Sequence, residues 1–282
     1  MPARYAVHPF LAARTAPERG AFALFGAPYD GTASFRSGSR EGPEAIRRAS
    51  EVLEDYCPVA DRSLAETAFA DLGDLELPLG DSAKVLECIA AQAHELFAAG
   101  VRPFLLGGEH LVSLPAILLA AERYRDLCLV QLDAHADLRE DYLGVPYSHA
   151  TVMRRAVERI TPEKLFQFGV RSGTREEWAF MRQHGTARPA TLEAAKAAAK
   201  AIGDRPVYLT LDLDVLDPSV LPGTGTPEPG GISFAELDAI LRVFAPCNVV
   251  AADAVELAPG LDPSGASAVV AAKAVRTMLV SY

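Results

Sequence analysis

The sequence predicts an α/β protein in which helices cover both faces of a parallel central sheet. Short apolar runs alternate with amphipathic segments along the whole chain, which is the pattern of consecutive β-α-β units. Each apolar run is nearly continuous, as expected for strands that are buried on both faces. Half of the 282 residues are hydrophobic and no linker interrupts the pattern, so we expect a single domain over residues 1–282.

The first half of the chain starts with residues 1–20, which we expect to form an irregular N-terminal arm. The strands expected after it cover residues 21–28, 67–72, 101–106 and 127–132. The helices expected in this half cover residues 43–56, 81–99, 110–125 and 148–160. Pro43 in a first turn, Gly100 after a last turn and Ser148 just before a first turn are typical of helix boundaries.

The second half continues the same alternation. Its expected strands cover residues 165–170, 207–212 and 247–255, and its expected helices cover residues 174–184, 191–202, 233–244 and 264–280. Two polar loops rich in Gly, Ser or Pro, residues 29–42 and 218–231, follow strands at their carboxyl ends. Ligands of parallel sheets bind at that edge, so we expect the functional site there.

The end of the strand at residues 127–132 carries the clearest chemical signal. The stretch LCLVQLDAHAD places Asp133, His135 and Asp137 two residues apart directly after an apolar run. In an extended chain this spacing puts all three side chains on one face. Carboxylates and an imidazole that converge at a strand end predict a metal site.

Two further strands end in residues of the same kind. His110 follows the strand at residues 101–106 in the motif GGEH, and Asp212 and Asp214 end the strand at residues 207–212. Each residue alone could be a core histidine or a helix-capping aspartate. Because three strand ends carry such residues, the sequence favours a shared metal site.

The overall composition excludes several classes of partner. A formal net charge of −10 disfavours nucleic acid and is compatible with a cationic substrate. No apolar run approaches the ~18 residues of a membrane span, so we expect no membrane partner. Four cysteines without paired spacing and an N-terminus unlike a signal peptide indicate a cytoplasmic protein.

Four motifs in order, GGEH, DAHAD, DLDVLDP and AVEL, resemble those of the ureohydrolases, the arginase and agmatinase family. The loop SFRSGSREGPEAIR resembles the substrate-side loop of that family, and the similarity extends over about residues 26–279. The segment DLREDYLGVPYSHATVMRR is most similar to that of bacterial agmatinases. The resemblance implies a three-layer α/β/α fold and a homo-trimer or homo-hexamer.

The resemblance also implies a site for two divalent metal ions. Carried over by motif, one ion would be held by His110, Asp133, Asp137 and Asp212, and the other by Asp133, His135, Asp212 and Asp214. Asp133 and Asp212 would therefore bridge the two ions. Oxygen-rich ligand sets with one imidazole per ion suit Mn²⁺.

The chemistry implied by the family needs three further roles. Hydrolysis of a guanidinium needs a nucleophilic water, and two metal ions would lower the pKa of that water. Asp137 would orient the water and move a proton to the leaving nitrogen. Glu256, in AVEL, resembles the carboxylate that pairs with the guanidinium. His149, in SHATVMRR, resembles a proton-shuttling histidine. The alternatives are an exposed Glu256 and a structural His149 at a helix start.

The leading hypothesis is hydrolysis of agmatine to putrescine and urea, with a small cationic guanidino compound as substrate. We expect Asp30 and Glu140 near the pocket mouth to favour an amine, while Arg139 could pair with a carboxylate. Guanidinobutyrase, arginase and other guanidino-acid hydrolases therefore remain alternatives. Departures from the family pattern at Ser37, Glu41 and residues 262–267 bear on the same question.

Proteins of other classes fit the sequence less well. Metallophosphoesterases share an Asp-x-His motif, but their downstream Gly-Asn-His motif is missing here. Deacetylases of the related fold use one zinc ion and fewer carboxylates, whereas His135 and Asp214 complete a second set here. A non-catalytic binding protein with this fold would be marked by loss of ligand residues, and none is lost.

Overall fold

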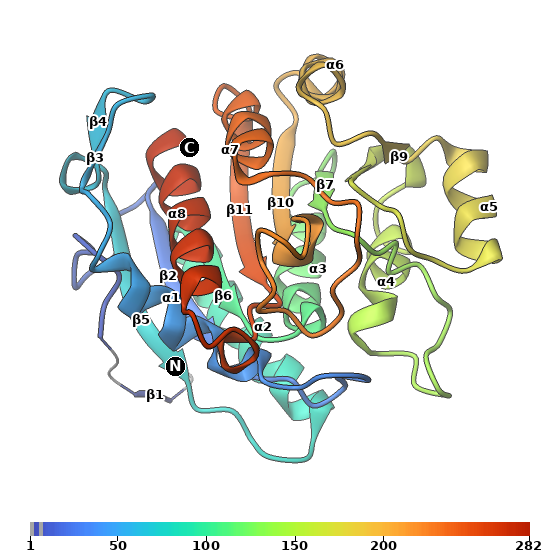
Figure 1. The fold of residues 1–282 in the computed structure, drawn as a ribbon, viewed down its shortest axis with the longest axis horizontal. Helices are drawn as coiled ribbons and strands as arrows, with labels where there is room; N and C mark the ends of the chain where they lie inside the picture. The colour runs from blue at the N-terminus through green and yellow to red at the C-terminus, as the bar shows by residue number, and fades with distance from the viewer. Residues whose placement is uncertain (1–2, 6–7) are drawn as a thin grey trace.

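The computed structural model describes residues 3–5 and 8–282, which form one nine-stranded sheet and a separate two-stranded hairpin (Figure 1). The strands of the large sheet lie in the order β1 (Arg4–Tyr5), β5 (Phe69–Leu75), β2 (Phe22–Ala27), β6 (Arg102–Gly107), β11 (Asn248–Val255), β10 (Pro206–Asp212), β7 (Cys128–Leu132), β8 (Leu165–Phe168) and β9 (Ala187–Arg188). All neighbouring strands are parallel except β1 and β5. The predicted parallel sheet is confirmed.

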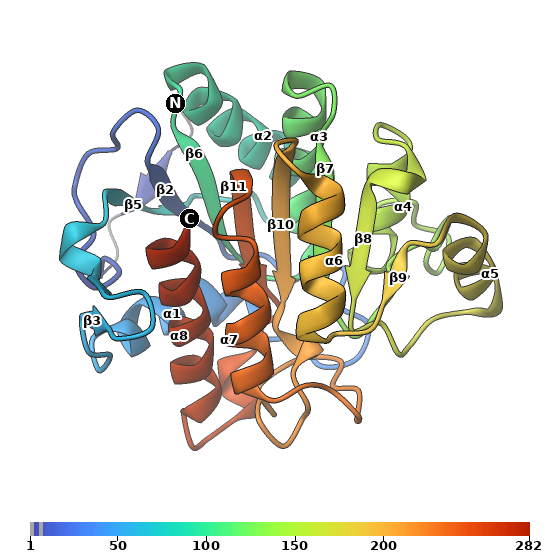
Figure 2. The ribbon, with the colours of Figure 1, turned by 90° about the horizontal axis from the view of Figure 1, so that it is seen from above.

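Helices cover both faces of this sheet, as the three-layer fold requires (Figure 2). One layer contains α1 (Gly42–Ser50), α8 (Ala266–Ser281), α7 (Phe234–Val243) and α6 (Leu192–Ile202). The other contains α2 (Ser82–Ala99), α3 (Leu114–Arg123) and α4 (Val152–Val157). Helix α5 (Arg175–His184) lies near the β9 edge. None of the helices in the described part of the chain is long and apolar enough to cross a membrane.

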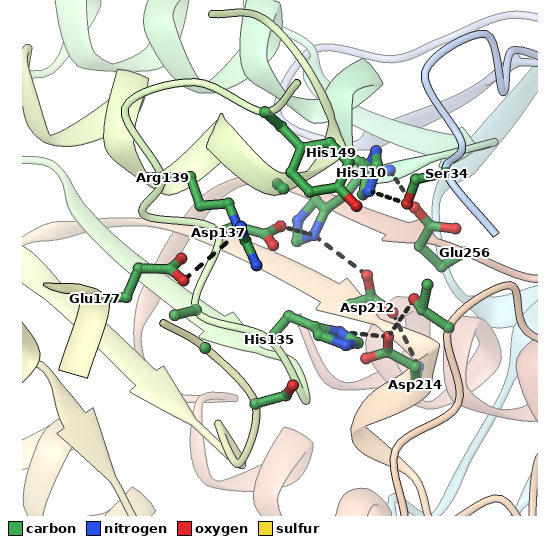
Figure 3. Close-up of a pocket in the computed structure, with 16 residues that line it drawn as sticks. Ser34, His110, His135, Asp137, Arg139, His149, Glu177, Asp212, Asp214 and Glu256 are labelled. Carbon is green, nitrogen blue, oxygen red and sulfur yellow. Dashed lines mark hydrogen bonds and ion pairs between the residues drawn. The ribbon is translucent and has the colours of Figure 1, made fainter. Parts of the chain in front are cut away.

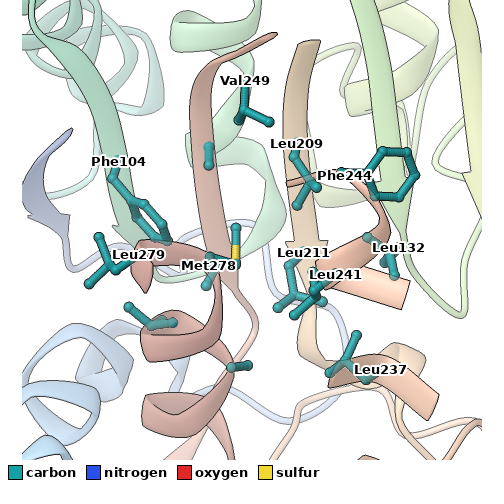
Figure 4. Packing of buried hydrophobic residues seen from close by; sticks show 14 of the residues in the cluster. Phe104, Leu132, Leu209, Leu211, Leu237, Leu241, Phe244, Val249, Met278 and Leu279 are labelled. Carbon is teal, nitrogen blue, oxygen red and sulfur yellow. The ribbon is translucent and has the colours of Figure 1, made fainter. Parts of the chain in front are cut away.

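Alternating strand residues supply two cores, one on each side of the sheet. In β10, Leu209 and Leu211 pack in the cluster with α7 and α8 (Figure 4). Tyr208 of the same strand packs with α2 and α3 on the other face. Phe244 closes the first cluster against Phe168, with ring centroids 6.1 Å apart. Because both faces of a strand are buried, its sequence shows an apolar run instead of an alternation.

Most element boundaries shift by a few residues from the sequence predictions, and two segments differ more. The helix predicted over residues 43–56 ends at Ser50, because the chain turns there and Tyr56 pairs with Ser63 in the hairpin of β3 (Tyr56–Cys57) and β4 (Arg62–Ser63). The arm predicted for residues 1–20 is not wholly irregular, because β1 pairs with β5 and Phe10 is buried. Residues 1–2 and 6–7 of the arm lie outside the described residues.

A buried arginine ties this end of the sheet to α1. Arg47 is fully buried and its guanidinium donates to Asp71 over 2.8 and 3.0 Å and also to Asp74. Asp71 in turn accepts from the backbone of Phe10 at 2.8 Å. The guanidinium of Arg47 therefore connects α1 to β5 and, through Asp71, to the N-terminal arm.

We expect Arg47→Ala to lower the free energy of unfolding by about 3–5 kcal/mol, because it leaves buried carboxylates without their cation. Urea denaturation followed by circular dichroism measures this. The neighbouring Arg48, exposed and paired with Glu44, is the matched control, and Arg48→Ala should have a much smaller effect. Equal losses of stability in the two variants would contradict the role of the buried Arg47 pairs in stabilising the fold.

Candidate active site

Most of the predicted site residues converge at the carboxyl edge of the four central strands (Figure 3). These strands lie in the order β6, β11, β10 and β7, so residues far apart in the sequence become neighbours. His110 follows β6, Glu256 follows β11, Asp212 ends β10, and Asp133 follows β7. The expectation that ligand-type residues gather at this edge is therefore met.

Two groups of side chains among the described residues could each hold a metal ion. They are His110, Asp133 and Asp212, and Asp133, His135 and Asp214, with the ligand atoms of each group within 4.8 Å of one another. Asp133 belongs to both groups, whereas Asp212 belongs only to the first. Asp137 adjoins the first group, since its Oδ2 lies 3.1 Å from His110 Nδ1.

The imidazole of His110 is oriented for a cation. Its Nδ1 lies 3.1 Å from Asp133 Oδ2 and 3.3 Å from Asp212 Oδ2. Within the described chain, this buried nitrogen has no partner in hydrogen-bonding geometry. A lone pair directed at several carboxylate oxygens fits a bound cation between them. In the second group, His135 Nδ1 lies 2.9 Å from Asp214 Oδ2.

The electrostatics of the site also favour bound cations. Burial, followed by the nearby Asp133 carboxylate, raises the pKa of Asp137 to about 7. Burial and the carboxylates of Asp214 and Asp133 raise the pKa of Asp212 well above its usual range. Crowded buried carboxylates disfavour one another's ionised forms, and divalent cations would offset that repulsion. The residues therefore fit the metal site that the sequence implied.

Asp137 and Glu256 both have left-handed backbone conformations. Their φ angles are 52° and 67°, which residues other than glycine rarely adopt. Glu256 is held there by its backbone amide, which donates to Gly108 O at 2.8 Å, and by His110 N, which donates to Oε1 at 2.7 Å. Strained backbone of this kind concentrates at functional sites. Both residues line one cavity of about 210 Å³.

The carboxyl group of Glu256 is suited to a cationic ligand. Burial, and then the nearby Glu109 carboxylate, raises its pKa to about 8. A cation entering the cavity would favour the ionised carboxylate and so bind more strongly. The alternative of an exposed, structural Glu256 does not agree with its place in the cavity lining.

His149 also lines the cavity, where it contacts the loop that follows β2. Its Nδ1 and Nε2 lie 3.3 Å from the hydroxyls of Thr32 and Ser34, and its backbone amide donates to Thr32 Oγ1 at 3.1 Å. Thr32 also donates to Glu109 at 2.7 Å, which anchors the loop. Burial lowers the pKa of His149 to about 4, so the imidazole is neutral at pH 7.

The three residues expected to contact substrate fall in different places. Arg139 lines the cavity, with Nε 3.8 Å from Glu177 Oε2. Asp30 does not line it: it is buried, accepts from Gly38 N at 2.8 Å and pairs with Arg40. Glu140 also lies outside the lining, because its exposed carboxylate pairs with two arginines of α4. The expected roles of Asp30 and Glu140 in the pocket are thus corrected.

Sequence reasoning missed several lining residues. Glu177 accepts from Thr174 N at 2.7 Å and from Leu138 N at 2.9 Å, and so caps α5 while its carboxylate borders the cavity. The spacing of Thr174 and Glu177 is a capping-box pattern, which predicts the start of α5 but not the place of Glu177 in the cavity lining. The other lining residues that the sequence did not single out include Ser34, Tyr142, Ser172 and Thr226.

The fold and the site together define a hydrolytic enzyme with an α/β/α architecture. Residues 20–280 match the model of the arginase family, and the chain belongs to that family. It is 44% identical to the agmatinase of Halalkalibacterium halodurans over 277 residues. The matched segment covers 97% of this chain and 96% of that relative.

Two further relatives extend this comparison. The N(1)-aminopropylagmatine ureohydrolase of Thermococcus kodakarensis is 41% identical over 227 residues, or 78% of this chain and 76% of that one. The solved structure of proclavaminate amidino hydrolase from Streptomyces clavuligerus has a TM-score of 0.90 at 30% identity and covers 99% of this chain and 98% of that one. The resemblance found in the motifs is confirmed.

Proposed function

We propose that the protein hydrolyses agmatine to putrescine and urea with two divalent ions, most suitably Mn²⁺. The observation that supports this best is that one cavity is lined by members of both cation-binding groups and by Glu256. The cavity is lined by more acidic than basic side chains, which suits a cationic guanidino substrate. The similarity to curated agmatinases supports agmatine within that class.

In this proposal, His110, Asp133, Asp137 and Asp212 hold one ion, and Asp133, His135, Asp212 and Asp214 hold the other. When bound, the two ions supply Lewis acidity and lower the pKa of a water molecule toward neutrality. Four carboxylates balance the charge of two divalent cations. Oxygen donors with one imidazole per ion suit Mn²⁺ better than a thiolate set would.

The remaining steps belong to the side chains of this chain. Glu256 would pair with the planar guanidinium and hold its carbon over the nucleophile. Asp137 would orient the nucleophile and transfer its proton to the departing nitrogen. His149, neutral and placed at the mouth, would carry a proton to the leaving amine, which cannot depart as an anion.

The ion count tests this arrangement directly. The protein, stripped of metal and dialysed against excess Mn²⁺, should bind two ions per chain, because each of the two groups has an imidazole of its own, His110 in one and His135 in the other. Inductively coupled plasma mass spectrometry gives the ratio. A single ion at saturation would disprove the two-metal arrangement and leave the family assignment intact.

Substrate choice is the second test. Agmatine lacks the α-carboxylate of arginine, and burying an unpaired carboxylate beside acidic groups costs a few kcal/mol. We therefore expect kcat/KM for agmatine to exceed that for arginine by at least ~100-fold. Urea release from agmatine, arginine, guanidinobutyrate and N(1)-aminopropylagmatine, with Mn²⁺ added, measures the preference.

Guanidinobutyrate is the second candidate substrate, because Arg139 lines the cavity. Glu177 partly offsets the positive charge of Arg139, so we expect guanidinobutyrate to react more slowly than agmatine. Turnover of guanidinobutyrate at the rate of agmatine or faster would overturn the agmatinase proposal. Arg139→Ala would then show whether this arginine holds the carboxylate.

We also propose that the enzyme is a cytoplasmic homo-trimer or homo-hexamer. The assembly follows from the family resemblance alone. The compartment is supported by four free cysteines, Cys57, Cys88, Cys128 and Cys247, which a reducing environment would preserve.

A further inference from the structure

A fully buried carboxylate lies beneath the site and takes no part in the proposed reaction. Asp253 in β11 accepts from Tyr208 Oη on Oδ2 at 2.8 Å and from Thr210 Oγ1 on Oδ1 at 2.6 Å. Thr210 and Asp253 are directly opposite each other across the β10–β11 ladder. Burial and Asp253 raise the pKa of Tyr208 well above its usual range, so its phenol stays protonated and donates.

Thr210 connects this carboxylate to His110. Its Oγ1 lies 2.9 Å from His110 Nε2, and both groups are buried. A hydroxyl has one hydrogen, and the short bond to Asp253 uses it. The oxygen of Thr210 can then only accept from His110, so the imidazole carries its hydrogen on Nε2. The lone pair on Nδ1 is consequently left facing Asp133, Asp137 and Asp212.

We propose that Thr210 and Asp253 are positioning residues that hold His110 in the Nε2–H tautomer and in the orientation needed to bind a divalent ion through Nδ1. This inference rests on the metal site of the proposed function. Partners of this kind behind a metal-binding histidine are typically worth 10–100-fold in metal affinity. The effect should be confined to the ion at His110, since the second group binds through His135.

Mn²⁺ binding to the whole protein, measured by isothermal titration calorimetry, tests the proposal without any substrate. Thr210→Val keeps the shape of the side chain and removes the hydroxyl, so one of the two ions should bind 10–100-fold more weakly. Thr210→Ser keeps the hydroxyl and should restore the affinity to within a few-fold of wild type. Unchanged binding of both ions by Thr210→Val would overturn the proposal.

Thr277→Val is the matched control. Thr277 is a buried threonine of α8 that donates to Asp238 at 2.6 Å, outside the cavity lining. Its substitution removes a similar buried bond, so it should lower stability without weakening either ion. An equal loss of Mn²⁺ affinity in Thr277→Val would show that the effect is general destabilisation, and would overturn the assignment to Thr210.

A measurement on the wild-type chain covers the case in which Thr210→Val does not fold. In protein labelled with ¹⁵N-histidine and loaded with diamagnetic Zn²⁺, the His110 signals, assigned by comparison with His110→Asn, should show a proton on Nε2 and the ion on Nδ1. The opposite tautomer would overturn the proposal. Both readouts are independent of turnover, so a failure to release urea would refute the proposed function alone.

Discussion

His149→Asn should lower kcat by about 10²–10⁴-fold while both metal ions remain bound. His149 lies within the cavity lining but outside both cation-binding groups among the described residues. Its burial keeps the imidazole neutral at pH 7, so it can accept a proton and pass it on. Asparagine retains a polar side chain near Thr32 and Ser34 but cannot carry a proton.

Steady-state urea release, together with metal analysis of the same samples, separates the two possible roles of His149. His184→Asn is the matched control, because His184 lies at the end of α5 and outside the cavity lining. It should retain wild-type turnover. If His149→Asn were also fully active, His149 would have only a structural role at the start of its helical turn.

Glu256→Gln should lower kcat/KM by roughly 30- to 4,000-fold. The substitution removes the negative charge beneath the guanidinium, and loss of one partner of a buried charge pair costs about 2–5 kcal/mol, at roughly 1.4 kcal/mol per tenfold. Glutamine keeps the shape, and its carbonyl oxygen can still accept from His110 N. The loss therefore reports the charge and not a collapse of the pocket.

Two controls make this result specific. The exposed Glu236 caps the first turn of α7, and Glu236→Gln should leave kcat/KM unchanged. Mn²⁺ binding to Glu256→Gln should still reach two ions, since Glu256 is in neither cation-binding group of the described chain. A kcat/KM for Glu256→Gln equal to wild type would remove Glu256 from substrate binding.

Local patterns in the sequence were sufficient to predict the sheet and the residues at its carboxyl edge. The buried strands appear as apolar runs, and a parallel arrangement brings all their carboxyl ends to one side. The spacing by two of Asp133 and His135 after such a run predicts a shared face, and the two side chains do belong to one cation-binding group. These properties depend on near neighbours and on chain order, so they can be read without the structure.

Long-range packing decided the remaining features. Asp30 and Glu140 belong to the predicted mouth segments, yet neighbouring arginines draw both carboxylates out of the cavity lining. Glu177 enters the lining because the start of α5 lies against the segment that follows β7, where Leu138 N donates to its carboxylate, and no local pattern specifies this contact.

The hydrogen-bonded chain from Asp253 through Thr210 to His110 depends on tertiary structure in the same way. It exists because β10 lies beside β11 in one register, with β6 on the other side of β11. The sequence by itself determined which ligand-type groups stand at the carboxyl ends of the strands. Strand register and loop packing, which join residues about a hundred positions apart, determined how those groups are held.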